Sequence, residues 1–301
     1  MRAVKCVLAG CLVLGVCAAL RADAIWDLQA VDANGEATHA KVGADPTNPG
    51  NKVVVEGIAL NYSEDYLDPG QQFQLYVHAE TPDQGGIAAW SGCFFQGGPG
   101  SQTWQDEFDR MTSSGFKPGD RVRVEGFVAF HRGKTNINER HSAAPAMDFT
   151  ISVLEADVGM PAPTLIPSVG SCNYFDQTRA GGGELYQATW CQVRDVWIHS
   201  TPEGWGAGKT ILVTDNGADT LPVLLSEMGD FDSYSAPAGV FSATGVFDQE
   251  DETFPFRGDY RLWVKNYGDL ELGAVVPEPA GWAVFAVGMG TVVMSRKRRR
   301  S

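Results

Sequence analysis

The sequence lacks the short motifs that identify the commonest hydrolases, redox proteins and nucleotide-binding enzymes. None of its five histidines belongs to a His-Glu-x-x-His pattern, and neither Cys-x-x-Cys nor Gly-x-Ser-x-Gly occurs. The glycine-rich residues 97–100 lead into Ser-Gln-Thr without a neighbouring lysine, which is typical of a surface turn and not of a phosphate loop. These absences disfavour a common hydrolase, and we expect a protein that is not an enzyme and has no catalytic residues, metal or cofactor.

Positive charge is also scarce. The chain has 23 basic and 37 acidic residues. Eight of the basic and two of the acidic residues lie in residues 1–24 and 275–301, which leaves 15 basic and 35 acidic residues, a net charge of -20, in residues 25–274. Such a field repels polyanions, and non-specific binding to nucleic acid needs Lys and Arg to neutralise phosphates. The composition therefore argues against nucleic acid as a partner.

Two acidic segments, Asp215–Asp219 and Asp248–Glu252, supply oxygen ligands of the kind that calcium prefers. Neither follows the full twelve-residue calcium loop. We therefore favour solvated turns at both places over a calcium site.

Long apolar runs are confined to the two ends of the chain. Two basic residues within the first five precede an apolar run from Cys6 to Leu20, and the small residues Ala22 and Ala24 follow it. This three-part pattern predicts a secretory signal peptide over residues 1–24, cleaved after Ala24 by signal peptidase once the Sec translocon has engaged it. Lipoprotein processing at Cys11 is the alternative, but it would leave almost no apolar segment ahead of the cysteine.

At the other end, residues 275–301 contain an apolar stretch that is blocked on one side and charged on the other. Pro277-Glu278-Pro279 precedes the apolar residues 280–295, and the tail is Arg296, Lys297, Arg298, Arg299 and Arg300. The stretch would span about 24 Å as a helix, somewhat less than a hydrocarbon core of about 30 Å. It predicts a single transmembrane helix with its arginines on the cytoplasmic side and the rest of the chain outside.

This ordered triplet, apolar helix and arginine cluster resembles the PEP-CTERM sorting signal of bacteria that carry exosortase. The resemblance covers only about the last 25 residues. It implies recognition by an exosortase-type processing enzyme, cleavage near the triplet, and attachment elsewhere on the cell surface or release into an extracellular polysaccharide matrix. A permanent membrane anchor is the alternative.

Removal of the signal peptide leaves only Cys93, Cys172 and Cys191. Export permits a disulfide, and an odd count leaves one thiol over. We expect Cys172 to pair with Cys191, with Cys93 as a small buried residue. Three reduced, buried thiols are the alternative.

Short alternating strands and glycine-rich turns fill the region between the two ends. In Arg121–Glu125 the valines point one way and the charged residues the other, as in a half-buried strand. The best helical pattern runs from Thr103 to Ser113 and stops at Gly115.

The region also contains an internal repeat. Pro118–Val128 matches Pro237–Phe247, with the same spacing from proline to a mid-strand glycine. Four further segments match more loosely. In order, residues 53–58, 73–77, 86–90 and 149–154 of the first copy correspond to residues 186–191, 210–213, 220–224 and 260–264 of the second.

Five strands per copy with a mid-strand glycine, and a helix between strands three and four of the first copy, resemble the OB fold. We therefore predict an all-β protein of two tandem five-stranded OB-like barrels, residues 25–158 and 171–274, joined by a proline-rich linker over residues 159–170. A two-sheet sandwich is the alternative.

One basic cluster follows the fourth strand of the first copy. In the OB interpretation His131, Lys134 and Asn136 lie in the loop before the fifth strand, next to the outward faces of Tyr76 and His78, where they could grip a sugar or a polyanion. A solvated hairpin tip that binds nothing is the favoured alternative. Four tryptophans at or near strand positions offer a sugar-stacking surface or, more simply, core residues: Trp190, Trp197, Trp205 and Trp263.

From these observations we expect an exported, non-catalytic protein of the cell envelope, anchored in the membrane and then sorted to the cell surface or extracellular matrix. The competing hypotheses are a binding module for carbohydrate or nucleic acid that uses the barrel loops, and an accessory module of a hydrolase.

Overall fold

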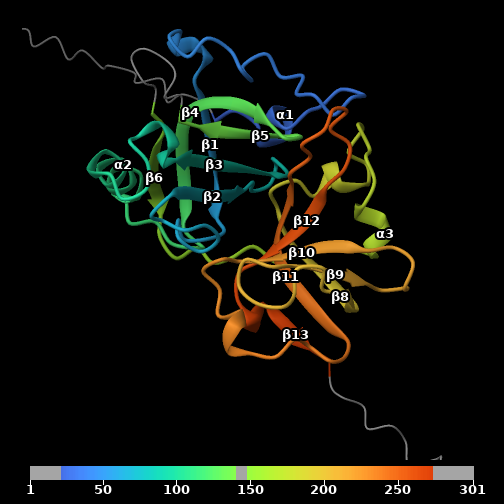
Figure 1. Ribbon diagram of the computed structural model, residues 1–301. Coiled ribbons are helices and arrows are strands. Elements are labelled where there is room, and N and C mark those ends of the chain that lie inside the picture. Colours follow the sequence, from blue (N-terminus) through green and yellow to red (C-terminus); the bar gives the residue numbers. More distant parts are fainter. Residues whose placement is uncertain (1–21, 140–147, 274–301) are drawn as a thin grey trace, which may run out of the picture.

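Strand β4 (Arg121–His131) shows how the alternating sequence produces a barrel wall. Its inward residues Val122 and Val124 are fully buried, whereas Arg123 on the other face forms an ion pair with Glu56 of the neighbouring strand, directly opposite it in the register. This geometry is seen in the computed structural model, which describes residues 22–139 and 148–273. Within those ranges the chain is mostly β and forms two closed five-stranded barrels (Figure 1).

The first barrel follows the strand order β1-β2-β3-β5-β4 and closes where β4 pairs antiparallel with β1. β3 and β5 run parallel, and the other neighbours are antiparallel. A sixth strand continues the sheet beyond β4. The remaining strand bounds are β1 (Val53–Ala59), β2 (Gln72–His78), β3 (Gly86–Gly92), β5 (Lys134–Asn138) and β6 (Thr150–Glu155).

The second barrel repeats this connectivity with the order β8-β9-β10-β12-β11, closed by the antiparallel pair β8 and β11. β10 and β12 are again the parallel pair. The bounds are β8 (Trp190–Ser200), β9 (Thr210–Thr214), β10 (Leu221–Leu225), β11 (Phe241–Gln249) and β12 (Tyr260–Val264), with β13 (Leu270–Leu272) added beside β11 as β6 is added beside β4. The prediction of a mostly β protein with two five-stranded OB-like barrels is therefore confirmed.

The fifth strand of the first barrel was predicted wrongly. The internal repeat matches Phe149–Leu154 with Tyr260–Val264. In the structure, however, the strand of the first barrel that is equivalent to β12 is β5, and β6 is equivalent to β13. Lys134–Asn138 is polar on its outward face, so it lacks the alternation expected of a strand, and only Ile137 enters the hydrophobic core. The second barrel covers this polar face and supplies the acids that bind Lys134.

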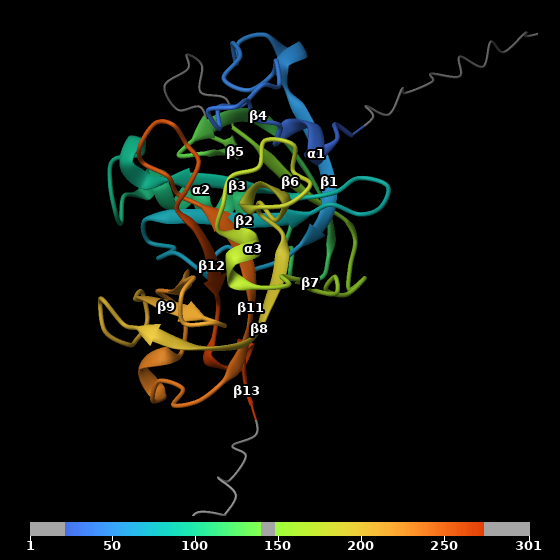
Figure 2. The same cartoon turned by 90° about the vertical axis from the view of Figure 1, so that its right-hand side faces the viewer.

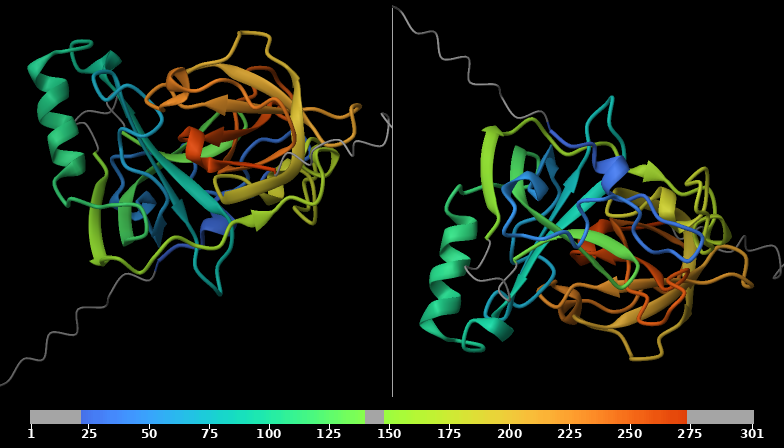
Figure 3. Two further views of the ribbon diagram at one scale, coloured as in Figure 1. Left: turned by 90° about the horizontal axis from the view of Figure 1, so that it is seen from below. Right: turned by 90° about the horizontal axis from the view of Figure 1, so that it is seen from above.

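Two helical segments close the first barrel. Helix α2 (Gln102–Thr112) was predicted over 103–113. Its N-cap is Ser101, whose hydroxyl accepts a hydrogen bond from the Trp104 backbone N–H. It buries Trp104 and Met111 against the first core on the side of that barrel remote from the second barrel (Figure 3). Helix α1 (Ile25–Leu28) inserts Ile25 and Leu28 into the same core.

The segment between the barrels is partly incorporated into the second one. β7 (Thr164–Leu165) runs parallel to β8, and the Ile166 backbone N–H donates to the Gln192 carbonyl (Figure 2). Helix α3 (Val169–Cys172) then places Cys172 in the second core. The 3₁₀ turns are η1 (Pro49–Asn51), η2 (Cys93–Phe95), η3 (Gly183–Leu185), η4 (Phe231–Ser233) and η5 (Tyr267–Asp269).

The structure does not contain the expected Cys172–Cys191 disulfide. Cys93, Cys172 and Cys191 are all free and buried, which is the alternative considered above. Cys172 and Cys191 share the second hydrophobic core, and burial raises the pKa of each thiol to about 12. Thiols that stay protonated react slowly, because the thiolate is the reactive form.

The two terminal predictions fall largely outside the described residues. Ala22 and Ala24 are described, whereas residues 1–21 and the sorting residues from Pro277 to Arg300 are not. Over residues 22–139 and 148–273, no helix combines the length and apolar character needed to cross a bilayer.

Mid-strand glycines let the long fourth strands bend from one neighbour to the next. β4 pairs with β1 up to Gly126 and with β5 from Phe127, and β11 changes partner from β8 to β12 around Gly245. A Cβ atom on Gly245 would lie 2.2 Å from the Trp263 carbonyl oxygen. Only glycine permits this close backbone approach.

We predict that Gly245→Ala destabilises the protein by about 2 kcal/mol or more, because the clash is with backbone that cannot move aside cheaply. Urea unfolding followed by tryptophan fluorescence measures the change. Gly239→Ala is the matched control, since a Cβ there meets no atom within 4 Å. Similar midpoints for the two variants would contradict the argument.

Candidate functional site

The residues predicted to bind a ligand lie on the face of the first barrel that contacts the second barrel. Tyr76, Lys134 and Asn136 are buried, and His78 is half-buried. His131, at the end of β4, retains 58% of its side-chain exposure. The residues that the sequence analysis groups together therefore do lie on one surface. Another part of the same chain covers most of that surface.

Buried charges form the centre of this contact. The Lys134 ammonium lies 2.8 Å from both carboxylate oxygens of Asp248 and 2.9 Å from Glu250 Oε2, and both acids belong to the second barrel or its β11–β12 loop. Asp248 is fully buried and Lys134 nearly so. Arg261 of β12 binds the same two acids, at 2.9 Å from Asp248 and 3.0 Å from Glu250. We call Lys134, Asp248, Glu250 and Arg261 the charge cluster.

The electrostatics of the charge cluster keep Glu250 ionised. Burial acts to raise the pKa of Glu250, but the charges of Lys134 and Arg261 outweigh burial and lower that pKa to about 2. Because the folded-state value lies below the ordinary glutamate value, the stabilising effect of Glu250 is complete above about pH 5 and is lost as the pH falls towards 2.

The turn between β4 and β5 extends the contact. Arg132 and Gly133 both have positive φ and form a two-residue hairpin turn, so the predicted loop is shorter than expected and Lys134 already belongs to β5. Arg132 forms ion pairs with Glu250 at 3.0 Å and Glu252 at 2.9 Å, and its carbonyl accepts a hydrogen bond from the Asp251 backbone N–H.

An aromatic cluster lies beside the charges. Trp263 of β12 packs against Tyr66 and Tyr76 of the first barrel, with ring centroids 5.0 and 6.5 Å apart. These rings share a buried apolar cluster with Leu60, Ala88, Ala188 and Val246, drawn from both barrels. Burial raises the pKa of the Tyr66 and Tyr76 hydroxyls well above the ordinary value, so both remain neutral.

Backbone groups fix the register of the two barrels. The Trp190 backbone N–H donates to His78 Nδ1 at 3.2 Å, so that nitrogen is unprotonated, and burial lowers the pKa of His78 in agreement with this role. A Cβ atom on Gly86 would lie 1.9 Å from the Ala188 carbonyl oxygen. The barrels therefore meet backbone to backbone at this point.

A second contact lies along the β11–β12 loop. Phe256 packs edge-on against Phe130 with ring centroids 5.3 Å apart, and its backbone N–H donates to the Asn34 carbonyl. Nearby, the Arg179 guanidinium lies 3.7 Å from the centre of the Trp26 ring and binds the Trp26 carbonyl. The contact between barrels thus extends well beyond the charge cluster.

This geometry corrects the ligand-binding interpretation. Lys134 points at the second barrel, where Asp248 and Glu250 match its charge. Asn136 lies on the same strand and is buried, but its Oδ1 has no hydrogen-bond partner among the described residues. A sugar or polyanion could reach them only if the two barrels separated. The polar outward face of β5, read as a ligand site in the sequence, is an intramolecular interface.

Asp215–Asp219 is a mostly exposed turn, as predicted, whereas Asp248–Glu252 is not a solvated turn, because Asp248 lies in β11 and both Asp248 and Asp251 are buried. Asp251 accepts hydrogen bonds from the backbone N–H groups of Thr253, Arg257 and Gly258, and Asp215 accepts one from Val169. No group of three or more His, Cys, Asp or Glu side chains suited to a metal ion occurs within the described parts of the chain.

The four tryptophans divide between core and surface. Trp263 and the half-buried Trp190 belong to the interface, whereas Trp205 packs on the second hydrophobic core and Trp197 remains 37% exposed. They do not form one stacking surface.

No protein-family model matches the chain, and no curated protein matches it.

The sequence contained partial signals of this interface. The sequence pattern around Asp248 and Glu250 predicts a solvated turn, with a calcium site as the alternative. Asp248 nevertheless continues the period-two pattern of β11, at a position where a buried strand usually carries an apolar residue. A charged residue inside a strand pattern needs an opposite charge nearby. The sequence could not show that its partner lay more than 100 residues away, at Lys134.

We predict that Asp248→Asn destabilises the whole protein by about 3 kcal/mol, because it leaves Lys134 and Arg261 short of their buried counter-charge. Urea denaturation at neutral pH measures the change. Glu56→Gln is the matched control: it removes the same charge from a pair with Arg123 that is about one-third exposed, and should cost about 1 kcal/mol or less. Equal costs would mean that the cluster is no more than a surface ion pair.

Proposed function

We propose that this chain is an exported, non-catalytic protein of the bacterial cell surface or extracellular matrix. Its signal peptide directs it through the Sec translocon, and its terminal segment anchors it in the membrane until an exosortase-type enzyme processes it. The observation that carries the proposal is the order of three features within residues 277–300: Pro277-Glu278-Pro279, an apolar stretch and five consecutive basic residues.

Two features of the barrels support a structural role. The face on which an OB barrel usually binds its ligand is covered in the first barrel by the second, and the basic side chains on that face are neutralised within the chain. The excess of acidic residues over residues 25–274 keeps such a module soluble outside the cell and away from polyanions.

We also propose a second function, binding of a neutral extracellular polysaccharide, on the strength of an aromatic platform at the far end of the second barrel. Tyr234 is 48% exposed and stacks on Tyr267 with ring centroids 4.3 Å apart, and Trp205 packs edge-on against Tyr267. Exposed aromatic faces of this kind suit the apolar faces of sugar rings, and the acidic surroundings disfavour an anionic ligand.

For the first function, we predict that the mature protein from a strain with an exosortase lacks Arg300, and that deletion of the exosortase gene leaves the arginine tail in place and the protein in the membrane fraction. Intact-mass spectrometry of both fractions measures this. Glu278→Gln changes only the triplet and should cause the same retention. Normal release of that variant would contradict a sorting role for the triplet.

For the second function, we predict that Tyr234→Ala lowers retention on neutral polysaccharide columns at least about tenfold, the loss expected when one stacking contact of roughly 1.4 kcal/mol is removed. Phe254→Ala, which removes another exposed aromatic ring on the same barrel, is the control. Unchanged retention of the Tyr234 variant, or no retention of the parent protein, would rule out the platform as a sugar site.

A further inference from the structure

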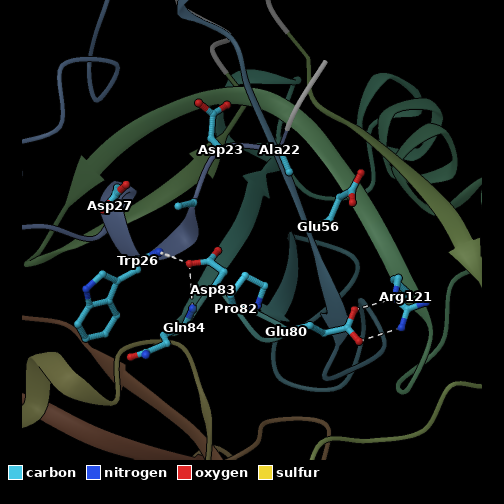
Figure 4. Close-up of a pocket in the computed structure, with 11 residues that line it drawn as sticks. Ala22, Asp23, Trp26, Asp27, Glu56, Glu80, Pro82, Asp83, Gln84 and Arg121 are labelled. Carbon is cyan, nitrogen blue, oxygen red and sulfur yellow. Dashed lines mark hydrogen bonds and ion pairs between the residues drawn. The ribbon is translucent and has the colours of Figure 1, made fainter. Parts of the chain in front are cut away.

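The start of helix α1 places a buried backbone nitrogen against a carboxylate. Ile25 is fully buried in the first core, and its backbone nitrogen donates to Asp83 Oδ2 at 2.6 Å. The next backbone nitrogen, of Trp26, lies 3.3 Å from Asp83 Oδ1 (Figure 4). One carboxylate therefore receives the first two N–H groups of helix α1.

Asp83 is positioned by its own loop. It lies between β2 and β3, where its backbone N–H donates to the Glu80 carbonyl and its Oδ1 accepts from the Gln84 backbone N–H at 2.8 Å. The hydrogen-bond partners of its carboxylate over the described residues are all backbone N–H groups, and the carboxylate has no ion pair there. The carboxylate is thus held in place without a full positive charge to balance it.

The surrounding pocket supplies no spare cation. Besides Asp83, its lining carries the charged residues Asp23, Asp27, Glu56, Glu80 and Arg121 (Figure 4). Arg121 is bound to Glu80 and to Glu155, Glu56 is bound to Arg123, and Asp23 is bound to Lys41. The pocket therefore has an excess of negative charge around the Ile25 nitrogen.

We propose that signal-peptide removal between Ala24 and Ile25 creates an α-ammonium group that forms an ion pair with Asp83, so that processing completes the N-terminal part of the first barrel. The proposal rests on the proposed export of the chain. Hydrolysis adds one water molecule: Ala24 leaves with a carboxylate, and the Ile25 amine takes up a proton from solvent. The nitrogen that donated one hydrogen bond can then donate three and carries a full charge.

The ion pair also offsets two costs of processing. A positive charge at the first residue of a helix is unfavourable because the N-terminal end already carries partial positive charge, and a carboxylate at 2.6 Å compensates it. Cleavage removes Asp23, which binds Lys41 at 2.7 Å and the Val54 backbone N–H at 3.0 Å. Charge-assisted hydrogen bonds to Asp83 are stronger than the neutral ones that they replace.

A mutant cycle tests the ion pair separately from these costs. Two chains that end at Ser301, one beginning at Ile25 and the other at Ala22, are purified in detergent with and without Asp83→Asn. We expect the substitution to lower Tm by about 2–4 °C more in the chain that begins at Ile25, since only in that chain is the Ile25 nitrogen an ammonium. Asp27→Asn, which removes a pocket carboxylate that does not contact the Ile25 nitrogen, should have equal effects in both chains. Equal effects of Asp83→Asn would overturn the proposal.

A second measurement needs no variant. In the folded chain that begins at Ile25, pairing with Asp83 should slow acylation of the α-amine near neutral pH by about tenfold or more relative to the same chain in urea, because one unit of pKa changes the reactive fraction tenfold. Equal rates would overturn the ion pair.

The N-terminus of the natively exported protein distinguishes the two proposals. Mass spectrometry should find Ile25 as the first residue. A first residue at another position in an exported product would overturn the inference while leaving export intact, whereas a product that retains Met1 would contradict both.

Discussion

The architecture depends on the burial of opposite charges between the two barrels. Lys134 reaches from β5 of the first barrel to Asp248 and Glu250 of the second, and Arg261 shares the same acids. Removing these charges from water costs free energy unless each charge lies beside an opposite one. The charge cluster therefore favours one relative placement of the barrels, because other placements would leave a buried charge unpaired. The surrounding rings of Tyr66, Tyr76 and Trp263 exclude water and supply the apolar burial that favours association.

The two barrels share one topology but differ in the connection between their fourth and fifth strands. In the first barrel the fourth and fifth strands are joined by the two-residue turn at Arg132 and Gly133, which leaves the face beside it open. In the second barrel the corresponding connection covers residues 250–259 and lies across the first barrel through Phe256. The longer loop of one copy therefore covers the surface exposed by the shorter loop of the other.

The face of the first barrel that the second barrel covers is the one on which OB barrels usually bind a ligand. The second barrel covers this face of the first, and the ion pairs of Lys134 and Arg132 with Asp248 and Glu250 neutralise its basic side chains within the chain. The surface that we propose for an external ligand lies elsewhere, at the aromatic pair Tyr234 and Tyr267.

The sequence by itself determined the local elements whose pattern repeats along the chain. Alternating valines identified β4, a glycine at the same spacing identified β11, and apolar residues at helical spacing located α2 to within one residue at each end. These elements are set by side chains close together in sequence. Only the tertiary structure decided that Lys134–Asn138 is a strand, that Cys172 and Cys191 remain free, and that the polar face of β5 meets Asp248. Each of those outcomes depends on burial and on partners distant in sequence, and the energy of a buried charge or thiol is fixed by its surroundings and not by its own residue type.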